Sequence, residues 1–515
     1  MKRGIAMKPG IRKYLLLAIG LLLLLVSNGR WIMPVATWLF PIFIIRFLRI
    51  QKSLWHTLIC AVAFVGVFCI SWQGIIPFPG FLYYAVVGGI GLAFFLPFII
   101  DKFIAPRLRG FIATLAFPLA YTTVEYIGFQ FTPFGTWGSL AYTQFGNLPF
   151  MQIASITGIY GLTFLITWFA SLVNWVWEEN FDWTKTSRGV KIYASVMAAV
   201  LLFGGAYLVF LSPRSNEIKV AGVQSHIAEA VLKPISKKLS EGDYSKATWT
   251  SYFVKTDIIV DDLFLKSEIV AKGGAKMVSW AENPVMIPKG DEPAFIERGK
   301  HLAKQEQIYL LLNYSISLST DPSRAPEEKM WSTRVVIVGP TGEVLSTYRK
   351  TILVPGYEAT LAVKGNDDAV VIDTPFGRIS SLICFDNDFP SFVRKQVGKE
   401  GVDIFFDPSG DWKDIDPYHT NMMAFRAIEN GFSVVRVTGL GLSAAYDYQG
   451  RTLATMDYFK TKDKVFTVYV PEKGVRTVYS QIGDLFSWLS IAGLIAIIGR
   501  VILKRKHTTS SKREP

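Results

Sequence analysis

The chain has 515 residues, of which half are hydrophobic and only 18% are charged. This balance is typical of a membrane protein that also carries a large soluble domain. The formal net charge is +13, but residues 214–483 hold 33 basic and 34 acidic side chains, so the excess lies beside the hydrophobic runs. A nucleic-acid-binding function therefore loses its main support.

Eight hydrophobic runs predict transmembrane helices, since about 20 residues of helix cross a bilayer core. The first run could instead be a signal peptide, although no small-residue cleavage site follows it. We expect a seven-span domain over 1–213, an eighth span over 484–503 and a basic tail over 504–515. The runs cover 13–29, 31–50, 55–77, 81–100, 110–131, 149–177, 191–212 and 485–503.

Lysine and arginine are concentrated on one side of the expected spans. If the N-terminus is cytoplasmic, the inner ends and loops hold 20 basic residues, whereas the three short outer loops hold only Arg30. This distribution is the positive-inside pattern. With eight spans, both termini are cytoplasmic and the segment 214–483 is extracytoplasmic.

The segment 214–483 alternates between strand-like and helix-like stretches, which predicts one α/β domain with its own core. Turn signals at 339–342 and 448–450 indicate hairpins. Strands are expected at 218–224, 275–280, 308–313, 334–338, 369–373, 379–383, 402–406 and 432–437. Helices are expected at 249–272, 293–306, 390–398 and 418–430.

Glu282, Lys350 and Cys384 follow strand-like stretches of this domain. Ligands of α/β folds bind beyond the carboxyl ends of strands, so a carboxylate, an ammonium group and a thiol are expected to meet there. Cys384 is also the only cysteine outside the hydrophobic runs, whereas Cys60 and Cys69 are expected to be packing residues. Taken singly, each of the three has an ordinary alternative: a surface carboxylate, a solvated basic pair and a core thiol.

In this order and spacing the three residues resemble the Glu–Lys–Cys triad of the nitrilase (carbon–nitrogen hydrolase) superfamily, which implies an α-β-β-α sandwich. The stretch Asp-Pro-Ser-Gly-Asp-Trp at 407–412 and the stretch at 425–431 fit that pattern. Together with the expected topology, the segments 131–137 and 156–162 narrow the resemblance to the apolipoprotein N-acyltransferase family.

Two departures from this family lie beside the triad. Glu358 keeps its offset from Lys350 but has different neighbours, and Phe385 and Asp386 stand where the family has a Tyr–Glu pair. Glu358 is expected to orient Lys350 or a proton-transfer water, or else to be a rim carboxylate. Phe385 and Asp386 are expected to support the nucleophile or contact substrate. These departures leave the acyl acceptor open.

The resemblance implies a multi-pass acyltransferase of the bacterial cell (inner) membrane. Glu282 would deprotonate Cys384, while Lys350 and the backbone N–H after Cys384 would stabilise the charge that develops on the attacked carbonyl oxygen. A fatty acyl chain would pass from a phospholipid to a Cys384 thioester, and then to the N-terminal amine of a diacylglyceryl-cysteine lipoprotein. We expect a monomer that needs no cofactor and no metal.

Other functions use the same residues. Water in place of the amine would give a membrane-tethered amidase, because the thioester intermediate allows either acceptor. Acyl transfer to a different amine is a related alternative. A membrane scaffold with an inactive domain is the non-enzymatic one, and the intact set of three reactive side chains argues against it.

Three residues of the membrane segments are further candidates. Glu125 lies within an expected span, where it either makes a structural hydrogen bond or contacts a lipid headgroup. Trp137 and Tyr142 lie in an uncharged loop and are expected to anchor the chain at the membrane interface or to line a lipid entry.

Overall fold

The computed structural model describes residues 9–210, 215–228, 232–235, 237, 246–318, 329–366 and 368–510. The chain divides into two compact units. The first contains Met1–Thr132, Trp137–Phe210 and Ile482–Pro515, and the second contains Pro133–Thr136 and Leu211–Gln481. The short segment Pro133–Thr136 thus leaves the helical unit and joins the α/β unit.

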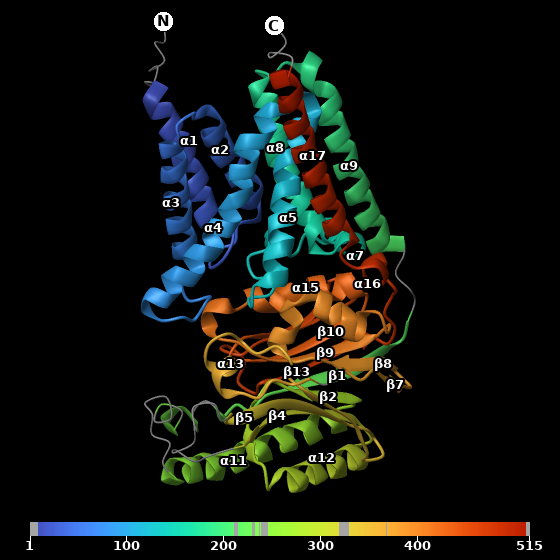
Figure 1. The fold of residues 1–515 in the computed structure, drawn as a ribbon. Coiled ribbons are helices and arrows are strands. Elements are labelled where there is room, and N and C mark those ends of the chain that lie inside the picture. Colours follow the sequence, from blue (N-terminus) through green and yellow to red (C-terminus); the bar gives the residue numbers. More distant parts are fainter. Residues whose placement is uncertain are drawn as a thin grey trace, which may run out of the picture. The chain divides into compact units, whose positions relative to one another are not determined.

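The long secondary-structure elements described for the first unit are all helices (Figure 1). Among the described residues, six stretches are long and apolar enough to cross a membrane. They are Leu54–Ser71 (α3), Gly80–Arg107 (containing α4, Gly80–Ile104), Gly110–Phe131 (containing α5, Ala116–Phe131), Ile159–Glu178 (α8), Trp183–Phe210 (α9) and Leu485–Lys504 (in α17, Leu485–Ser510). The first two expected spans are the helices Pro9–Leu25 (α1) and Pro34–Ile50 (α2), which have 17 residues each.

The expected span at 149–177 is not one helix. It consists of Leu148–Met151 (α6), Ala154–Thr157 (α7) and α8, and the chain turns at Gly158, whose φ is +63°. A left-handed residue cannot continue a right-handed helix, and glycine adopts it at little cost. The expected inner loop 178–191 is also shorter, because α9 starts at Trp183, where the Asp182 carboxylate accepts a hydrogen bond from the Thr184 N–H (3.0 Å).

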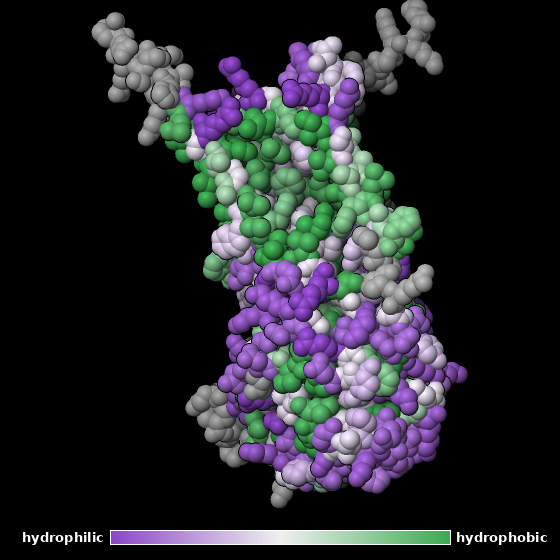
Figure 2. Space-filling model, turned by 90° about the vertical axis from the view of Figure 1, so that its right-hand side faces the viewer, coloured by the Kyte–Doolittle hydropathy of each residue, from purple (hydrophilic) through white to green (hydrophobic). Residues whose placement is uncertain are grey.

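The outer surface of the first unit is hydrophobic where its long helices lie, as Figure 2 shows for one face. Leu202 and Val209 of α9 and Leu489 and Ile495 of α17 are all more than half exposed. Lipid makes such exposure favourable, whereas contiguous apolar surface of this extent is rare on a soluble monomer. The protein is therefore a membrane protein.

The second unit contains two stacked sheets with helices on their outer faces (Figure 1). One sheet has the order β13-β1-β2-β4-β5-β6, with β3 beside β4, and the other has the order β12-β11-β10-β9-β8-β7. Lys246–Lys272 (α11) and Glu292–Glu306 (α12) cover the first sheet, and Tyr418–Asn430 (α15) covers the second. The expected α-β-β-α sandwich is confirmed. The strands of the first sheet are Glu217–Val223 (β1), Met277–Trp280 (β2), Met286–Pro288 (β3), Tyr309–Ser317 (β4), Trp331–Val338 (β5), Val344–Arg349 (β6) and Val465–Pro471 (β13).

The second sheet carries a parallel centre, in which β8, β9 and β10 run side by side. The hairpins predicted at 339–342 and 448–450 are confirmed, because they join β5 to β6 and β11 to β12. The sequence analysis gave no bounds for β6, β11 and β12 and did not predict β3 or β13. The strands of this sheet are Ile372–Thr374 (β7), Gly377–Ser381 (β8), Ile404–Gly410 (β9), Ser433–Gly439 (β10), Leu442–Tyr446 (β11) and Thr452–Asp457 (β12).

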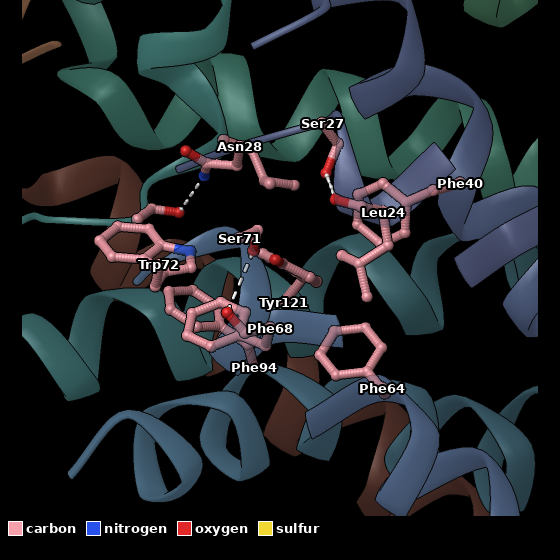
Figure 3. Close-up of a pocket in the computed structure, with 12 residues that line it drawn as sticks. Leu24, Ser27, Asn28, Phe40, Phe64, Phe68, Ser71, Trp72, Phe94 and Tyr121 are labelled. Carbon is pink, nitrogen blue, oxygen red and sulfur yellow. Dashed lines mark hydrogen bonds between the residues drawn. The ribbon is translucent and has the colours of Figure 1, made fainter. Parts of the chain in front are cut away.

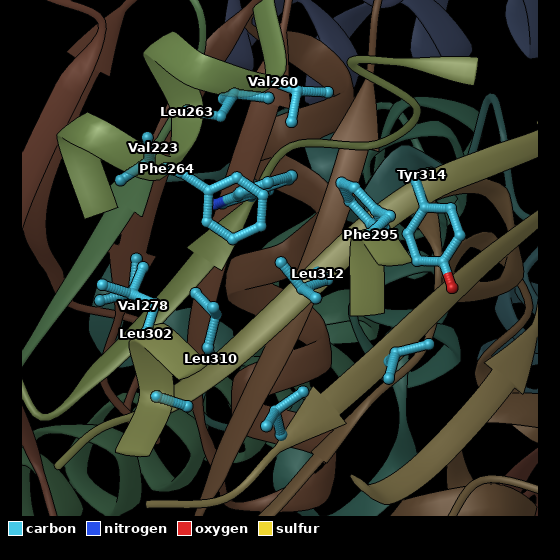
Figure 4. Close-up of a cluster of buried hydrophobic side chains, with 14 of the residues drawn as sticks. Val223, Val260, Leu263, Phe264, Val278, Phe295, Leu302, Leu310, Leu312 and Tyr314 are labelled. Atoms are coloured by element: carbon cyan, nitrogen blue, oxygen red, sulfur yellow. The ribbon is translucent and has the colours of Figure 1, made fainter. Parts of the chain in front are cut away.

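A hydrophobic core between the first sheet and helices α11 and α12 fixes the end of β2 (Figure 4). The fully buried Trp280 packs against Phe264 and Phe295, with ring centroids 5.1 and 6.0 Å away. Its indole N–H donates to the Ser267 hydroxyl at 2.9 Å. Burial of one such ring contributes about 1.5–3 kcal/mol, so the chain leaves β2 from a fixed point, two residues before Glu282.

Candidate active site

Glu282, Lys350 and Cys384 come together at one edge of the two sheets. Glu282 follows β2, and its backbone N–H donates to the Ser409 carbonyl of β9 at 3.1 Å, which ties the two sheets together at this point. Lys350 directly follows β6, and Cys384 comes three residues after β8. The strand expected at 379–383 lies two residues earlier in the structure and ends at Ser381, so Cys384 is not its direct continuation.

The Lys350 ammonium group is the centre of the cluster. It donates to Glu282 Oε1 at 2.8 Å and to both carboxylate oxygens of Glu358 at 2.8 and 2.9 Å. The side chain is only 2% exposed. Burial alone would lower the pKa of Lys350, but the two carboxylates hold that pKa well above its usual value. Lys350 is therefore a fixed cation.

Cys384 opens the short 3-10 helix Cys384–Asp388 (η4) in a left-handed conformation, with φ +50°. Few non-glycine residues adopt this region, and such strain clusters at functional sites. The Cys384 N–H donates to Asp407 Oδ1 at 3.2 Å, while the next N–H, of Phe385, belongs to the first turn of η4, where helix geometry supplies no acceptor.

The Cys384 thiol is buried close to the Glu282 carboxyl and donates to the Gly410 carbonyl at 3.9 Å. Burial and the Glu282 charge raise the pKa of Cys384 well above its usual value. Burial also raises the pKa of Glu282, although Lys350 opposes that rise. The resting cluster thus holds a thiol next to a carboxylate of increased basicity, which is the arrangement that a proton transfer needs.

Glu358 is placed by its own helix, Tyr357–Leu361 (α13). Besides its bonds to Lys350, Glu358 Oε2 accepts from the Val354 N–H at 2.7 Å. Its side chain is 16% exposed, so it borders the cluster on the more open side. The structure thereby brings Glu358 together with the three predicted residues.

Asp386 does not point at the triad but joins the loops that carry it. Its Oδ1 accepts from the N–H groups of Thr351 and Ile352, just after Lys350, and its Oδ2 accepts from the Ile383 N–H, just before Cys384. The Tyr348 hydroxyl donates to it as well, at 3.0 Å. Burial raises the pKa of Asp386 to about 7, against the effect of these donors.

Phe385 packs edge-on against Phe389, with ring centroids 5.4 Å apart. This contact lies within the turn itself, because Phe389 caps the C-terminal end of η4.

A buried ionic network lies behind Cys384 and was not foreseen from the sequence. It consists of Asp388, Asp407, Asp411, His419 and Arg436, all nearly or fully buried. Arg436 of β10 donates to Asp407 and to Asp411, and His419 at the start of α15 lies between Asp388 and Asp411. An arginine within the otherwise hydrophobic stretch 434–437 was the signal that could have revealed it, because a buried charge requires a partner.

Cys384, Asp411 and His419 place three potential ligand atoms within 4.8 Å of one another. Their chemistry does not suit a metal ion. Both ring nitrogens of His419 already face carboxylates, and the Arg436 guanidinium lies 2.9 Å from both Asp411 and His419. A cation placed there would compete with a fixed positive charge for the same carboxylate.

The predicted residues of the membrane segments belong to the first unit. Glu125 is buried, and its Oε1 accepts from the hydroxyls of Ser139 (2.9 Å) and Thr163 (2.8 Å). This is the structural hydrogen bonding that was one of its two expected roles. Trp137 and Tyr142 are also buried, the latter in the 3-10 helix Leu140–Gln144 (η3).

A small cavity lies inside the first unit (Figure 3). Half of the residues in its wall are aromatic, and the Asn28 side-chain amide in that wall donates to the Gly138 carbonyl at 2.8 Å. The space open to the centre of a water molecule is about 20 Å³, which is enough for one water and far too little for an acyl chain.

Comparison with known proteins matches both units. The model of the carbon–nitrogen hydrolase family matches residues 238–478, and that of the apolipoprotein N-acyltransferase N-terminal domain matches residues 15–172. Apolipoprotein N-acyltransferase of Geobacter metallireducens is 27% identical over 423 residues, which cover 77% of this chain and 76% of that protein. The corresponding protein of Rickettsia bellii is 25% identical over 375 residues, 68% of each chain.

Among solved structures, an amidase from Nesterenkonia sp. matches 54% of this chain and 97% of its own, at 18% identity and a TM-score of 0.38. The two family matches, by contrast, agree with the order of the two units along the chain. The chain therefore belongs to the apolipoprotein N-acyltransferase family, with a second unit of the carbon–nitrogen hydrolase type.

Proposed function

We propose that the protein transfers a fatty acyl chain from a phospholipid to the N-terminal amine of a diacylglyceryl-cysteine lipoprotein, through a thioester on Cys384. The observation that carries this proposal is the contact of Glu282, Lys350 and Cys384 in one buried cluster. Family membership supports the class of reaction, because the relatives are named apolipoprotein N-acyltransferases.

The first half-reaction forms the thioester. Glu282 takes the proton from Cys384 Sγ, and the thiolate attacks the carbonyl carbon of a phospholipid ester. The Lys350 ammonium and the Phe385 N–H stabilise the oxyanion; one such donor is worth about 2.7–4 kcal/mol. The ester C–O bond then breaks, and the departing oxygen takes the proton from Glu282, which releases a lysophospholipid.

The second half-reaction forms the amide. The acceptor amine attacks the thioester carbon while Glu282 takes one of its protons. The C–S bond breaks, and the proton returns to Cys384, so the cluster ends in its starting state. Glu358 keeps Lys350 in place in both steps, because it holds that ammonium group by two hydrogen bonds that neither half-reaction uses.

The charge pattern supports an orientation in the cell membrane. The basic residues of the short loops and of both ends favour cytoplasmic termini, which leaves the second unit outside the cytoplasm. A lipid acyl donor and a lipidated acceptor are both available at that face. The chain then consists of a membrane domain over 1–213, a catalytic domain over 214–483, a final span over 484–503 and a basic tail over 504–515.

Labelled phospholipid tests the proposal directly. Purified protein is incubated with a phospholipid that carries a labelled acyl chain, and intact-mass measurement follows label on the protein before and after a diacylated lipopeptide is added. We expect label on Cys384 that moves to the peptide amine. Cys384→Ala should remove the labelling, and Cys69→Ala, in the helix α3, is the matched control that should not.

Three results would contradict the proposal. Label on the Cys384→Ala protein would exclude the nucleophile. Protein that is never labelled would exclude the thioester. Label that is released only as free fatty acid, even with lipopeptide present, would indicate a hydrolase.

A further inference from the structure

His419 is held between two carboxylates on opposite sides of its ring. Its Nε2 lies 2.9 Å from Asp388 Oδ1, and its Nδ1 lies 2.7 Å from Asp411 Oδ1. The three side chains are at most 3% exposed. A neutral imidazole has one N–H and can donate to only one of these carboxylates, so hydrogen bonds to both of them require the imidazolium.

The network that contains His419 holds both ends of the turn that carries the nucleophile. Asp407 accepts the Cys384 N–H at the start of η4 (3.2 Å) and the Asn387 side-chain amide near its end (2.7 Å). At the end of η4, Asp388 is bound by His419. Arg436 joins the two ends, because its guanidinium binds Asp407 on one side and Asp411, the other partner of His419, at 2.9 Å.

We propose that His419, as an imidazolium, is a positioning residue that keeps η4 anchored at Asp388 and so keeps Cys384 in its strained conformation facing Glu282. This proposal rests on the proposed function, because it concerns the rate at which Cys384 is acylated. The residue touches no reacting atom of that scheme, and it acts only through Asp388 and the turn.

The charges of the network explain why the proton matters. Asp388 on η4, Asp407 and Asp411 on and after β9, and Arg436 on β10 surround the ring, with the Cys384 thiol close by. With His419 protonated, three carboxylates face two cations. Without the proton, Nδ1 becomes an acceptor for the Arg436 N–H that lies 2.9 Å away, and its bond to Asp411 is lost.

The same end of η4 also holds Pro133–Thr136, the segment that joins this unit from between α5 and η3. The Asp388 carbonyl accepts from both the Thr136 N–H (3.0 Å) and the Thr136 hydroxyl (2.8 Å). Gly135 has φ +58°, and a Cβ there would lie 2.8 Å from that carbonyl. Asp388 is therefore fixed through its main chain by this segment and through its side chain by His419.

The proton is retained at neutral pH. Burial works to lower the pKa of His419, but Asp388 and Asp411 raise it to about 9. Because the pKa is raised above its ordinary value of about 6.5, the ionic attraction of His419 for Asp388 and Asp411 is complete below that value and is lost as the pH rises through about 9. Above that pH the anchor at Asp388 is weakened to a hydrogen bond from a neutral ring.

The test measures acylation of Cys384 by labelled phospholipid in a single turnover, between pH 6 and pH 10, with the full-length protein. We expect the wild-type rate to fall near pH 9. His419→Gln should be about 10- to 100-fold slower at pH 7, since small misplacements of reacting groups have effects of this size, and should lack that fall. His301→Gln, at an exposed histidine of α12, is the matched control and should behave as wild type.

Asp388→Asn separates positioning from folding, because asparagine keeps the shape and one acceptor while it removes the charge that raises the pKa of His419. We expect its alkaline fall at a lower pH than in the wild type. A His419→Gln rate within threefold of wild type, or an unchanged fall in Asp388→Asn, would overturn the positioning role. Wild-type protein that forms no acyl-Cys384 at all would instead overturn the proposed function.

Discussion

Replacing Glu282 by glutamine removes the base from the cluster and leaves its shape. The Glu282 side chain is only 9% exposed and is bonded to Lys350 at 2.8 Å, and Lys350 keeps its two bonds to Glu358 in the variant. The fold should therefore survive, with an apparent melting temperature close to that of the wild type. What changes is the path by which the Cys384 thiol loses its proton.

The size of the effect follows from the state of the thiol. An ordinary cysteine, with a pKa of about 8.5, is about 3% thiolate at pH 7, and burial raises the pKa of Cys384 well above that of an ordinary thiol. Without a base, reaction depends on this small fraction. A general base contributes about 10²–10⁴-fold, so Glu282→Gln should acylate about 10²–10⁴-fold more slowly, which is about 3–5 kcal/mol of activation free energy.

The pH dependence identifies the cause. Loss of the Glu282 charge relieves one of the influences that raise the pKa of Cys384, but burial, the larger one, remains. The acylation rate of the variant should consequently rise about tenfold per pH unit from pH 7 upward, in step with its thiolate fraction. The wild-type rate should be nearly flat between pH 7 and pH 8, below the fall expected near pH 9.

The assay is single-turnover acylation by labelled phospholipid, followed by intact-mass spectrometry from pH 6 to pH 9. Glu297→Gln is the matched control, because Glu297 lies on α12 with its side chain 71% exposed. A Glu282→Gln rate within threefold of the wild type at pH 7 would refute the reasoning, and so would a variant rate that does not change with pH.

Two further changes probe the framework of the site. Lys350→Met leaves two largely enclosed carboxylates, Glu282 and Glu358, without their cation, so the free energy of unfolding should fall by about 3–5 kcal/mol. Because the pKa of Glu282 is already raised and rises further without Lys350, the loss should be greater at pH 8 than at pH 5, and equal melting curves at the two pH values would contradict this. Asp386→Asn turns an amide NH₂ towards the backbone N–H groups of Thr351 and Ile352 or of Ile383, which are themselves donors. The variant should therefore lose about 1–3 kcal/mol of unfolding free energy and be acylated more slowly. An unchanged melting temperature and rate would show that Asp386 does not hold the two loops together.

Chemistry that depends on local composition could be predicted from the sequence. The hydrophobic runs, the α/β character of 214–483 and the class of reaction were all available there, because hydropathy, periodicity and motif order are properties of contiguous residues. The same reasoning selected Glu282, Lys350, Cys384 and Glu358, which the structure brings into mutual contact. Their catalytic roles remain predictions for the acylation experiments.

Features that depend on pairing between distant residues were decided only by the tertiary structure. The sequence showed a single hydrophobic stretch at 149–177, whereas the backbone at Gly158 divides it. Asp386 was expected near the nucleophile, yet its partnership with Thr351 and Ile352 depends on how two loops meet beyond different sheets. No local pattern encodes that meeting.

The buried ionic network is the clearest example of contacts that the sequence did not reveal. Asp388, His419 and Arg436 are separated by 31 and 17 positions along the chain, and each is an ordinary polar residue when it is considered alone. The sequence by itself determined which reactive groups the protein has and that it lies in a membrane. Only the packing of η4, β9, β10 and α15 decided which buried charges hold the nucleophile, because a charge excluded from water must find its partner in space.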